Sequence, residues 1–293
     1  MMLVPIIYFI VFKYLPMFGN ILAFRRYRPG LGPWGTEWVG FMYFERFLKD
    51  PMFLRALRNT IQLSLFGIVV NFPLPIIFAI ILSEARIKWF KKVVQTVSYM
   101  PYFISVVVVV TMMEQLLSPS GGLLNKFLGN FGIAPIYFMN LAEWFRPIYV
   151  LSDTWQSTGW SAIIYLAAIT NINHELFEAA EIDGAGRIKK IWYVTIPSIL
   201  PTVMMLLILR MGSILSVSFE KVLLLYTPAN SYVSDVLSTM VYRVGIVGSA
   251  GISGSSPNYS YGTAMGLFLG VVGVILVQGS NRLSRKLTSE SLF

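Results

Sequence analysis

The chain has 293 residues, of which 56% are hydrophobic and only 13% charged, and it contains no cysteine. Soluble domains carry about 25% charged residues, so water cannot be the main solvent of this chain. The absence of cysteine excludes disulfides, thiolate metal sites and iron–sulfur clusters. The net charge of +9 comes from short basic clusters between apolar runs, a pattern that disfavours nucleic acid as a partner and favours lipid headgroups, proteins or an anionic solute.

Long apolar runs predict an all-α membrane protein, because about 20 apolar residues span the hydrocarbon core of a bilayer. We expect six transmembrane helices, at residues 2–24, 60–83, 93–116, 147–169, 199–217 and 261–278. The first run lacks the basic segment and small-residue cleavage site of a signal peptide, so we expect a retained helix. Prolines within several runs, at Pro16, Pro73, Pro75 and Pro101, predict kinked helices around a cavity.

A short amphipathic segment lies between the fourth and fifth runs. It reads EAAEIDGA at residues 178–185 and is followed by VTIP at residues 194–197. Its alanines and Ile182 can form an apolar contact while the carboxylates stay in water. Gly184 allows a sharp turn, and Pro197 suits the first turn of the next helix. A helix of this kind can dock in the groove of a partner.

This segment resembles the signature of the inner-membrane permeases of ABC importers, which is Glu-Ala-Ala, three residues, Gly, nine residues, Ile-x-Leu-Pro. Glu178, Ala179 and Ala180 precede Gly184 at that spacing, and the final tetrapeptide replaces Ile by Val and Leu by Ile. The residues Asp183-Gly184-Ala185 are typical of the sugar branch. The resemblance extends over roughly residues 3–286, and the segments 12–19, 97–105 and 117–122 look like large-oligosaccharide permeases close to the alginate and rhamnogalacturonan importers.

The resemblance implies a type I ABC importer permease in a bacterial cytoplasmic membrane, with both termini inside. It divides the chain into residues 1–59, a first helix with an external interfacial segment; 60–286, the permease domain with a cytoplasmic coupling loop at 171–197; and 287–293, a cytoplasmic tail. The residues implied in coupling to the ATPase are Glu178, Ala179, Ala180, Asp183, Gly184 and Pro197.

The resemblance also implies partners. They are a homologous second permease, two ATPase subunits that form a homodimer, an external solute-binding protein and an oligosaccharide substrate. The chain has no Walker A sequence, so ATP and Mg belong to the ATPase subunits and no catalytic, cofactor or metal site is expected here. The positive-inside rule does not test the orientation, because the inner segments carry ten Lys and Arg residues and the outer segments eleven.

The fourth run is too polar to face lipid all round. A sugar needs aromatic faces and hydrogen-bonding groups, and in the related maltose-type permeases the sugar contacts lie near this run and near the end of the fifth. The resemblance therefore makes the following residues candidates for the substrate path: Asp153, Gln156, Ser157, Trp160, Gly212, Ser216 and Glu220.

Arg210 lies midway along the fifth run and needs an anion. We expect a structural ion pair with Asp153; Glu220 or a substrate carboxylate are the alternatives. His174 is the only histidine, so a metal ligand set is not expected. The basic cluster at residues 25–28 could attract an anionic uronide, hold the binding protein or simply lie at the interface.

Three other functions remain open at this point. A permease of the same class could carry a non-sugar solute, such as a polyamine or phosphate. An intramembrane enzyme would need clustered carboxylates, a histidine motif or a metal set, none of which is evident in the sequence. A passive channel would have no use for an ATPase-docking segment. The second permease could also be another copy of this chain.

Overall fold

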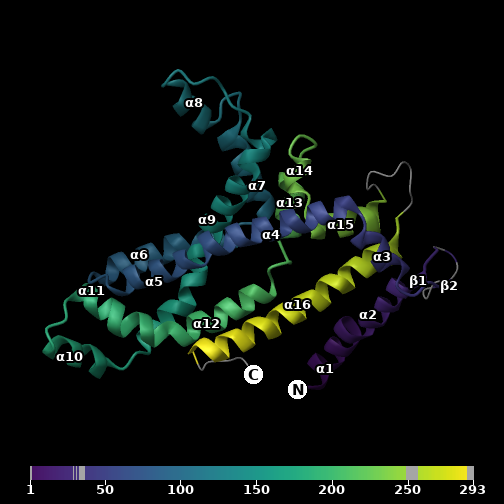
Figure 1. Ribbon diagram of the computed structural model, residues 1–293. Coiled ribbons are helices and arrows are strands. Elements are labelled where there is room, and N and C mark those ends of the chain that lie inside the picture. Colours follow the sequence, from purple (N-terminus) through teal and green to yellow (C-terminus); the bar gives the residue numbers. More distant parts are fainter. Residues whose placement is uncertain (1, 29, 31, 33–36, 249–256, 289–293) are drawn as a thin grey trace.

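The computed structural model describes residues 2–28, 30, 32, 37–248 and 257–288 (Figure 1). The regular secondary structure of this part of the chain is helical apart from one antiparallel pair of two-residue strands, β1 (Arg25–Arg26) and β2 (Glu37–Trp38). The predicted all-α class is therefore confirmed. Of the expected tail, residues 289–293 lie outside the described residues, while 287 and 288 belong to the last helix.

The helices in chain order are α1 (Leu3–Phe9), α2 (Leu15–Met17), α3 (Met42–Leu48), α4 (Pro51–Asn71), α5 (Pro73–Ser83), α6 (Lys88–Tyr99), α7 (Val106–Leu117), α8 (Leu123–Gly129), α9 (Ala142–Thr170), α10 (His174–Ile182), α11 (Arg187–Lys190), α12 (Ile196–Gly212), α13 (Phe219–Leu225), α14 (Ser231–Ser234), α15 (Leu237–Tyr242) and α16 (Tyr259–Thr288). Turns of π-helix (Ile10–Tyr14, Ile191–Thr195, Arg243–Val247) and of 3-10 helix (Phe18–Phe24, Met100–Phe103, Phe138–Asn140) continue or connect them.

Each of the six predicted runs corresponds to a helical segment. Four segments of the described chain are long and apolar enough to cross a membrane: Leu3–Phe24, Pro51–Ser83, Arg187–Gly212 and Tyr259–Arg282. The bent pair formed by α6 and α7 makes a fifth. The remaining predicted run, at residues 147–169, lies in α9, which is 29 residues long but is not among the segments apolar enough to cross a membrane by composition alone.

The third run differs from the expected kinked helix, because α6 and α7 meet at 99°. Pro101 lacks an N–H group and lies in the 3-10 turn that ends α6. Ser105 then begins α7 as its N-cap, accepting a bond from the Val108 N–H at 3.4 Å. Gln156 of α9 donates to the Ile104 carbonyl at 2.8 Å, which satisfies a backbone group that the break leaves without a helical partner.

The second span is longer than predicted because it begins at Pro51 rather than at residue 60. Asp50 caps it by accepting the Met52 N–H at 2.8 Å, and Pro51 occupies the first turn. The 33 residues of α4 and α5 measure about 50 Å, against a hydrocarbon core of about 30 Å. The span is therefore longer than the core is thick, and Arg55 and Arg58 in the first turns of α4 indicate that this end lies beyond the hydrocarbon.

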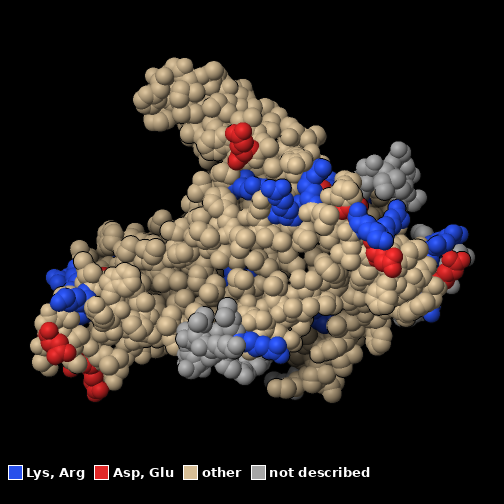
Figure 2. All heavy atoms as spheres, in the orientation of Figure 1, with Lys and Arg blue, Asp and Glu red and all other residues tan. Residues whose placement is uncertain are grey.

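The central helix of the bundle is α9, which contacts α4, α5, α6 and α12. At Gly159 the contact with α6 leaves no room for a side chain, since an added Cβ would lie 2.1 Å from the Ser98 carbonyl oxygen. Charged atoms gather around α10 and α11 at one end and around α3, β1 and β2 at the other, and a further blue group lies between them near α4 and α13, while much of the remaining surface is uncharged (Figure 2). This distribution fits a protein that spans a bilayer.

Candidate solute pathway and coupling segment

One face of α9 opens into a polar cavity. Asp153, Ser157 and Trp160 lie four and three residues apart, so they project from the same side of the helix. With Asn71 and Arg210 they line a cavity of about 530 Å³ between α4, α5, α9 and α12. Three of the predicted substrate-path residues are thus placed together beside the cationic side chain of Arg210.

Asp153 is the centre of a polar cluster in this cavity. Its Oδ2 accepts a bond from Asn71 Nδ2 at 2.8 Å, and its Oδ1 lies 3.6 Å from Lys221 Nζ. The Lys221 side chain is 1% exposed, and its ammonium also lies 5.3 Å from the centre of the Tyr149 ring. Thr154 donates to the amide oxygen of Asn71, so that amide bridges two neighbouring residues of α9.

This cluster corrects the expected ion pair between Arg210 and Asp153. Lys221 takes the place of Arg210, because α13 folds back against α9 and brings its lysine to the carboxylate. Among the residues that the structure describes, no carboxylate lies within ion-pair distance of Arg210. Arg210 therefore presents an uncompensated positive charge to the cavity.

A second, smaller cavity of about 200 Å³ adjoins the first. Asn71, Asp153 and Arg210 line both, and the hydroxyl-bearing side chains of the second cavity include Ser64, Tyr149, Ser213, Ser216 and Ser218. Ser216 is thus also placed at the polar site. The two cavities share their charged groups and together form one polar region along α9.

The remaining candidates lie elsewhere. Gln156 donates its hydrogen bond to the Ile104 carbonyl at the break before α7. Gly212 packs against α16, where an added Cβ would lie 2.1 Å from Val277 Cγ2, and lines neither cavity. Glu220 is exposed at the start of α13 and also lies outside both cavities. Trp160 is 40% exposed and stacks on Tyr102 with ring centres 4.7 Å apart.

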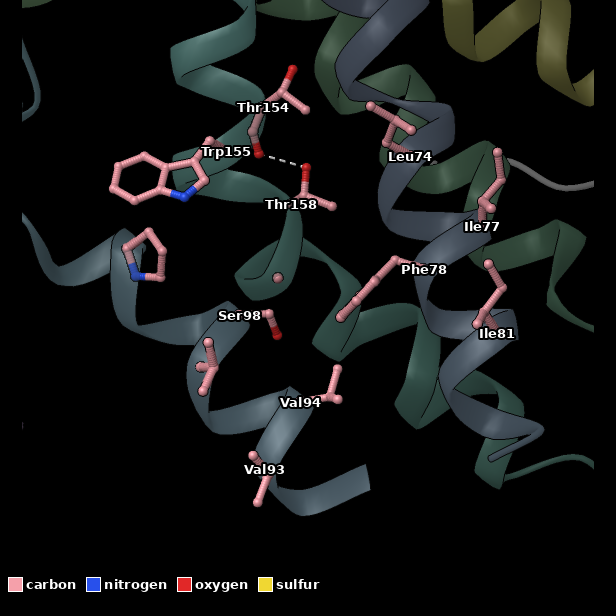
Figure 3. Close-up of a pocket in the computed structure, with 13 residues that line it drawn as sticks. Leu74, Ile77, Phe78, Ile81, Val93, Val94, Ser98, Thr154, Trp155 and Thr158 are labelled. Atoms are coloured by element: carbon pink, nitrogen blue, oxygen red, sulfur yellow. Dashed lines mark hydrogen bonds between the residues drawn. The ribbon is translucent and has the colours of Figure 1, made fainter. Parts of the chain in front are cut away.

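The opposite side of α9 faces a larger cavity of about 710 Å³ that is almost wholly apolar (Figure 3). Leu74, Ile77 and Ile81 of α5 line one wall, and valines of α6 line the other. Its few hydroxyls already have partners in the protein: Thr158 donates to the Thr154 carbonyl at 2.6 Å, and Thr154 contacts the Val150 carbonyl and the Asn71 amide oxygen. This cavity therefore suits apolar contacts and offers little to a sugar.

The predicted coupling segment forms α10, at one end of the molecule (Figure 1). Asn173 begins the helix by accepting the Glu175 N–H at 3.1 Å. The helix ends in a Schellman motif, in which the Ala185 N–H bonds the Ala180 carbonyl at 2.8 Å and the Gly184 N–H bonds the Glu181 carbonyl at 2.9 Å. Gly184 has a φ of +73°, a left-handed conformation that favours glycine.

Two ion pairs connect this end to the helices on either side. Lys190 of α11 pairs with Glu181, and Arg187 lies 3.6 Å from Glu84 after α5. Hydrogen bonding and charge attraction from Lys190 lower the pKa of the Glu181 carboxyl below its ordinary value. Ile182, beside this pair, is 87% exposed. The ion pairs therefore hold the segment against the neighbouring helices, while the apolar side chain of Ile182 stays exposed to solvent.

The other predicted coupling residues lie on or near this surface. Glu178, Ala179 and Asp183 are exposed, and Ala180 is half-buried. Pro197 lies in the first turn of α12, as expected. No group of three or more potential metal-ligating side chains comes together in the described chain.

Sequence reasoning missed Asn71 and Lys221. Asn71 is an amide in the middle of an uncharged apolar run, and such a residue in a membrane helix needs a polar partner. Lys221 precedes four apolar residues, which could have indicated a buried lysine.

These features together define a multi-span membrane transport protein with a polar region along its central helix and an exposed docking helix at one end. Residues 71–289 match the family described as binding-protein-dependent transport system inner membrane component, and the chain belongs to this family. The expected membership is confirmed.

The chain is similar to permeases over nearly its whole length. Protein LplB of Bacillus subtilis is 42% identical over 100% of this chain and 90% of that protein. The polygalacturonan/rhamnogalacturonan transport system permease protein YteP of the same organism is 43% identical over 100% of this chain and 89% of that protein. A bacterial alginate ABC transporter, solved with an alginate pentasaccharide-bound periplasmic protein, has a chain 40% identical, with a TM-score of 0.89 over 99% of this chain and 95% of that one.

Proposed function

We propose that this chain is one permease subunit of an ATP-driven importer for acidic oligosaccharides derived from polysaccharides. The observation that carries the proposal is the polar region along α9, where Asp153 and Lys221 neutralise each other and Arg210 retains its charge. An acidic sugar supplies the missing anion. Two relatives, at 40% and 43% identity, carry an acidic polysaccharide in their descriptions, which supports the same substrate class.

In the proposed pathway, each side chain has a separate task. Trp160 and its stacked partner Tyr102 offer an aromatic face to a sugar ring. Ser157 and Ser216 offer hydroxyls, and Arg210 faces a carboxylate. Asp153 holds Lys221 and Asn71 in place, so its role is to organise the wall of the cavity. Alternating access would expose this region to each side of the membrane in turn.

The exposed helix α10 is proposed as the contact with an ATPase subunit. Its exposed carboxylates and Ile182 would enter a groove of that partner, which would carry ATP and Mg. In this proposal α10 and both termini would lie on the cytoplasmic side, with the coupling loop at 171–197. A chain with one such helix serves one ATPase subunit, so a second, homologous permease would complete the pathway.

Copurification from the native membrane tests this proposal. We expect a second permease and an ATPase to accompany the chain, and ATP hydrolysis to rise when a binding protein loaded with an acidic oligosaccharide is added. Glu178→Lys should assemble but lose this stimulation, whereas Glu45→Lys, at the far end of the molecule, should keep it. An assembled chain without an ATPase would contradict the proposal.

A further inference from the structure

A third cavity, of about 470 Å³, lies where α4, α9 and α14 meet, and three arginines line it. Arg55 and Arg58 come from the first turns of α4, and Arg146 comes from the first turns of α9. The other polar side chains of the wall are the neutral Asn59, Gln62 and Tyr232. The wall contains no carboxylate, and blue atoms gather in this region of the surface (Figure 2).

The three arginines have no anionic partner in the part of the chain that the structure describes. Arg146 donates to Gln62 Oε1 at 2.6 Å, but its buried Nε has no hydrogen-bond partner. Arg55 lies 4.6 Å over the ring of Tyr232, a contact that leaves its N–H groups available. The charges of Arg58 and Arg146 repel each other.

An anion in this cavity would supply the two things that the arginines lack, a hydrogen-bond acceptor and an opposite charge. It would accept the unpaired N–H groups and compensate three like charges, and the planar guanidinium fork matches a carboxylate with two parallel hydrogen bonds. We propose that this cavity is an anion-recognition site that receives a carboxylate of the transported oligosaccharide before the sugar reaches the region around Asp153.

The position of the cavity along α4 supports this order. Arg55 and Arg58 line the cavity at the start of the helix, Gly67 lines the small central cavity, and Asn71 lines both central cavities. Residues 55 to 71 of a helix span roughly 24 Å. The arginine cavity also lies at the end of α4 that projects beyond the hydrocarbon, opposite to α10. An oligosaccharide would thus meet the arginines at the outer end of the path.

This inference rests on the proposed function but can fail separately from it. The chain has no native cysteine, so a single Leu54→Cys variant reports on the cavity, where Leu54 is 53% exposed. The assembled importer in phosphatidylcholine nanodiscs is treated with a thiol reagent, and labelling of this cysteine is followed by mass spectrometry. The probes are trigalacturonate and the neutral trisaccharide made by reducing its carboxyl groups. Tyr193→Cys, near α11 and 80% exposed, is the control.

Trigalacturonate should slow labelling of the cavity cysteine and leave the control cysteine unaffected, and the neutral trisaccharide should protect neither. Adding Arg146→Gln should raise the trigalacturonate concentration needed for protection about tenfold, because a hydrogen bond to a charged group is lost. Arg58→Gln, an exposed position, provides the same test without altering a buried side chain.

Three results would overturn the proposal while leaving the importer assignment intact. They are no protection by trigalacturonate, equal protection by the neutral sugar, and protection that survives both arginine substitutions. Repeating the assay with phosphatidylglycerol in the nanodiscs identifies a lipid occupant. Protection by that lipid alone would assign the site to a phosphate headgroup and reject the sugar carboxylate.

Discussion

Removing the carboxylate of Asp153 should destabilise the protein strongly. Lys221 is 1% exposed, and Asp153 is the only carboxylate within ion-pair distance of it in the described chain, at 3.6 Å. At an effective dielectric constant of about 20, that separation corresponds to about 4–5 kcal/mol of attraction. Breaking a buried pair by removing one partner typically costs about 3–5 kcal/mol, because the remaining charge stays buried. We expect a loss of this size for Asp153→Ala.

The double variant separates loss of the pair from loss of packing. Asp153→Ala with Lys221→Met removes both charges and should recover most of the lost stability, since an apolar replacement of a buried pair is often nearly neutral. Arg210→Gln, which breaks no ion pair in the described chain, should cost little and serves as the control. Denaturant unfolding of the purified protein in detergent measures all three variants against the unaltered protein. A double variant as unstable as Asp153→Ala, or a larger loss for Arg210→Gln, would refute the pairing.

Three further outcomes are expected. Gly184→Ala should lower the ATP hydrolysis stimulated by the loaded binding protein, because alanine disfavours the φ of +73° by about 1–2 kcal/mol, whereas Gly186→Ala, at φ −68°, should not. Gly159→Ala should lower the free energy of unfolding by about 1–3 kcal/mol, since the new Cβ would meet the backbone of α6, and thermal unfolding measures the loss. By carboxyl NMR, Glu181 should stay ionised to a lower pH than an ordinary glutamate, keeping its contact until the pH falls through this lowered pKa, and Lys190→Gln should raise the pKa again.

Local sequence signals predicted the helices but not all of their ends. The run at 261–278 lies within Tyr259–Arg282, because an uncharged stretch of this length has few alternatives in a membrane. The second span begins earlier than predicted because its first turns carry arginines, which hydropathy excludes from a span although the helix continues through them. The break after Pro101 was expected only as a kink, since the carbonyl that it exposes is satisfied by Gln156, 52 residues away along the chain.

The helix and the turn of the proposed coupling segment follow from local sequence, because both depend on neighbouring residues, while the coupling role of its residues stays a prediction. The polar cavity was predicted only in part. Asp153, Ser157 and Trp160 share a face by helical spacing alone, but the partner of Asp153 depends on how α13 folds back onto α9. No local pattern distinguishes Lys221 from Arg210 as that partner, because the choice is made by tertiary packing.

The two unlike sides of α9 restrict how this helix can move. One side carries Asp153 among polar groups, and the other meets the aliphatic walls formed by α5 and α6. Rolling the helix about its own axis would swing a carboxylate into a dry compartment and leave Lys221 without its counterion, both at a large energetic penalty. Tilting or sliding it together with α5 and α13 avoids both. The helix is therefore suited to move without rotating about its own axis. Its polar side would then line the solute pathway in every conformational state.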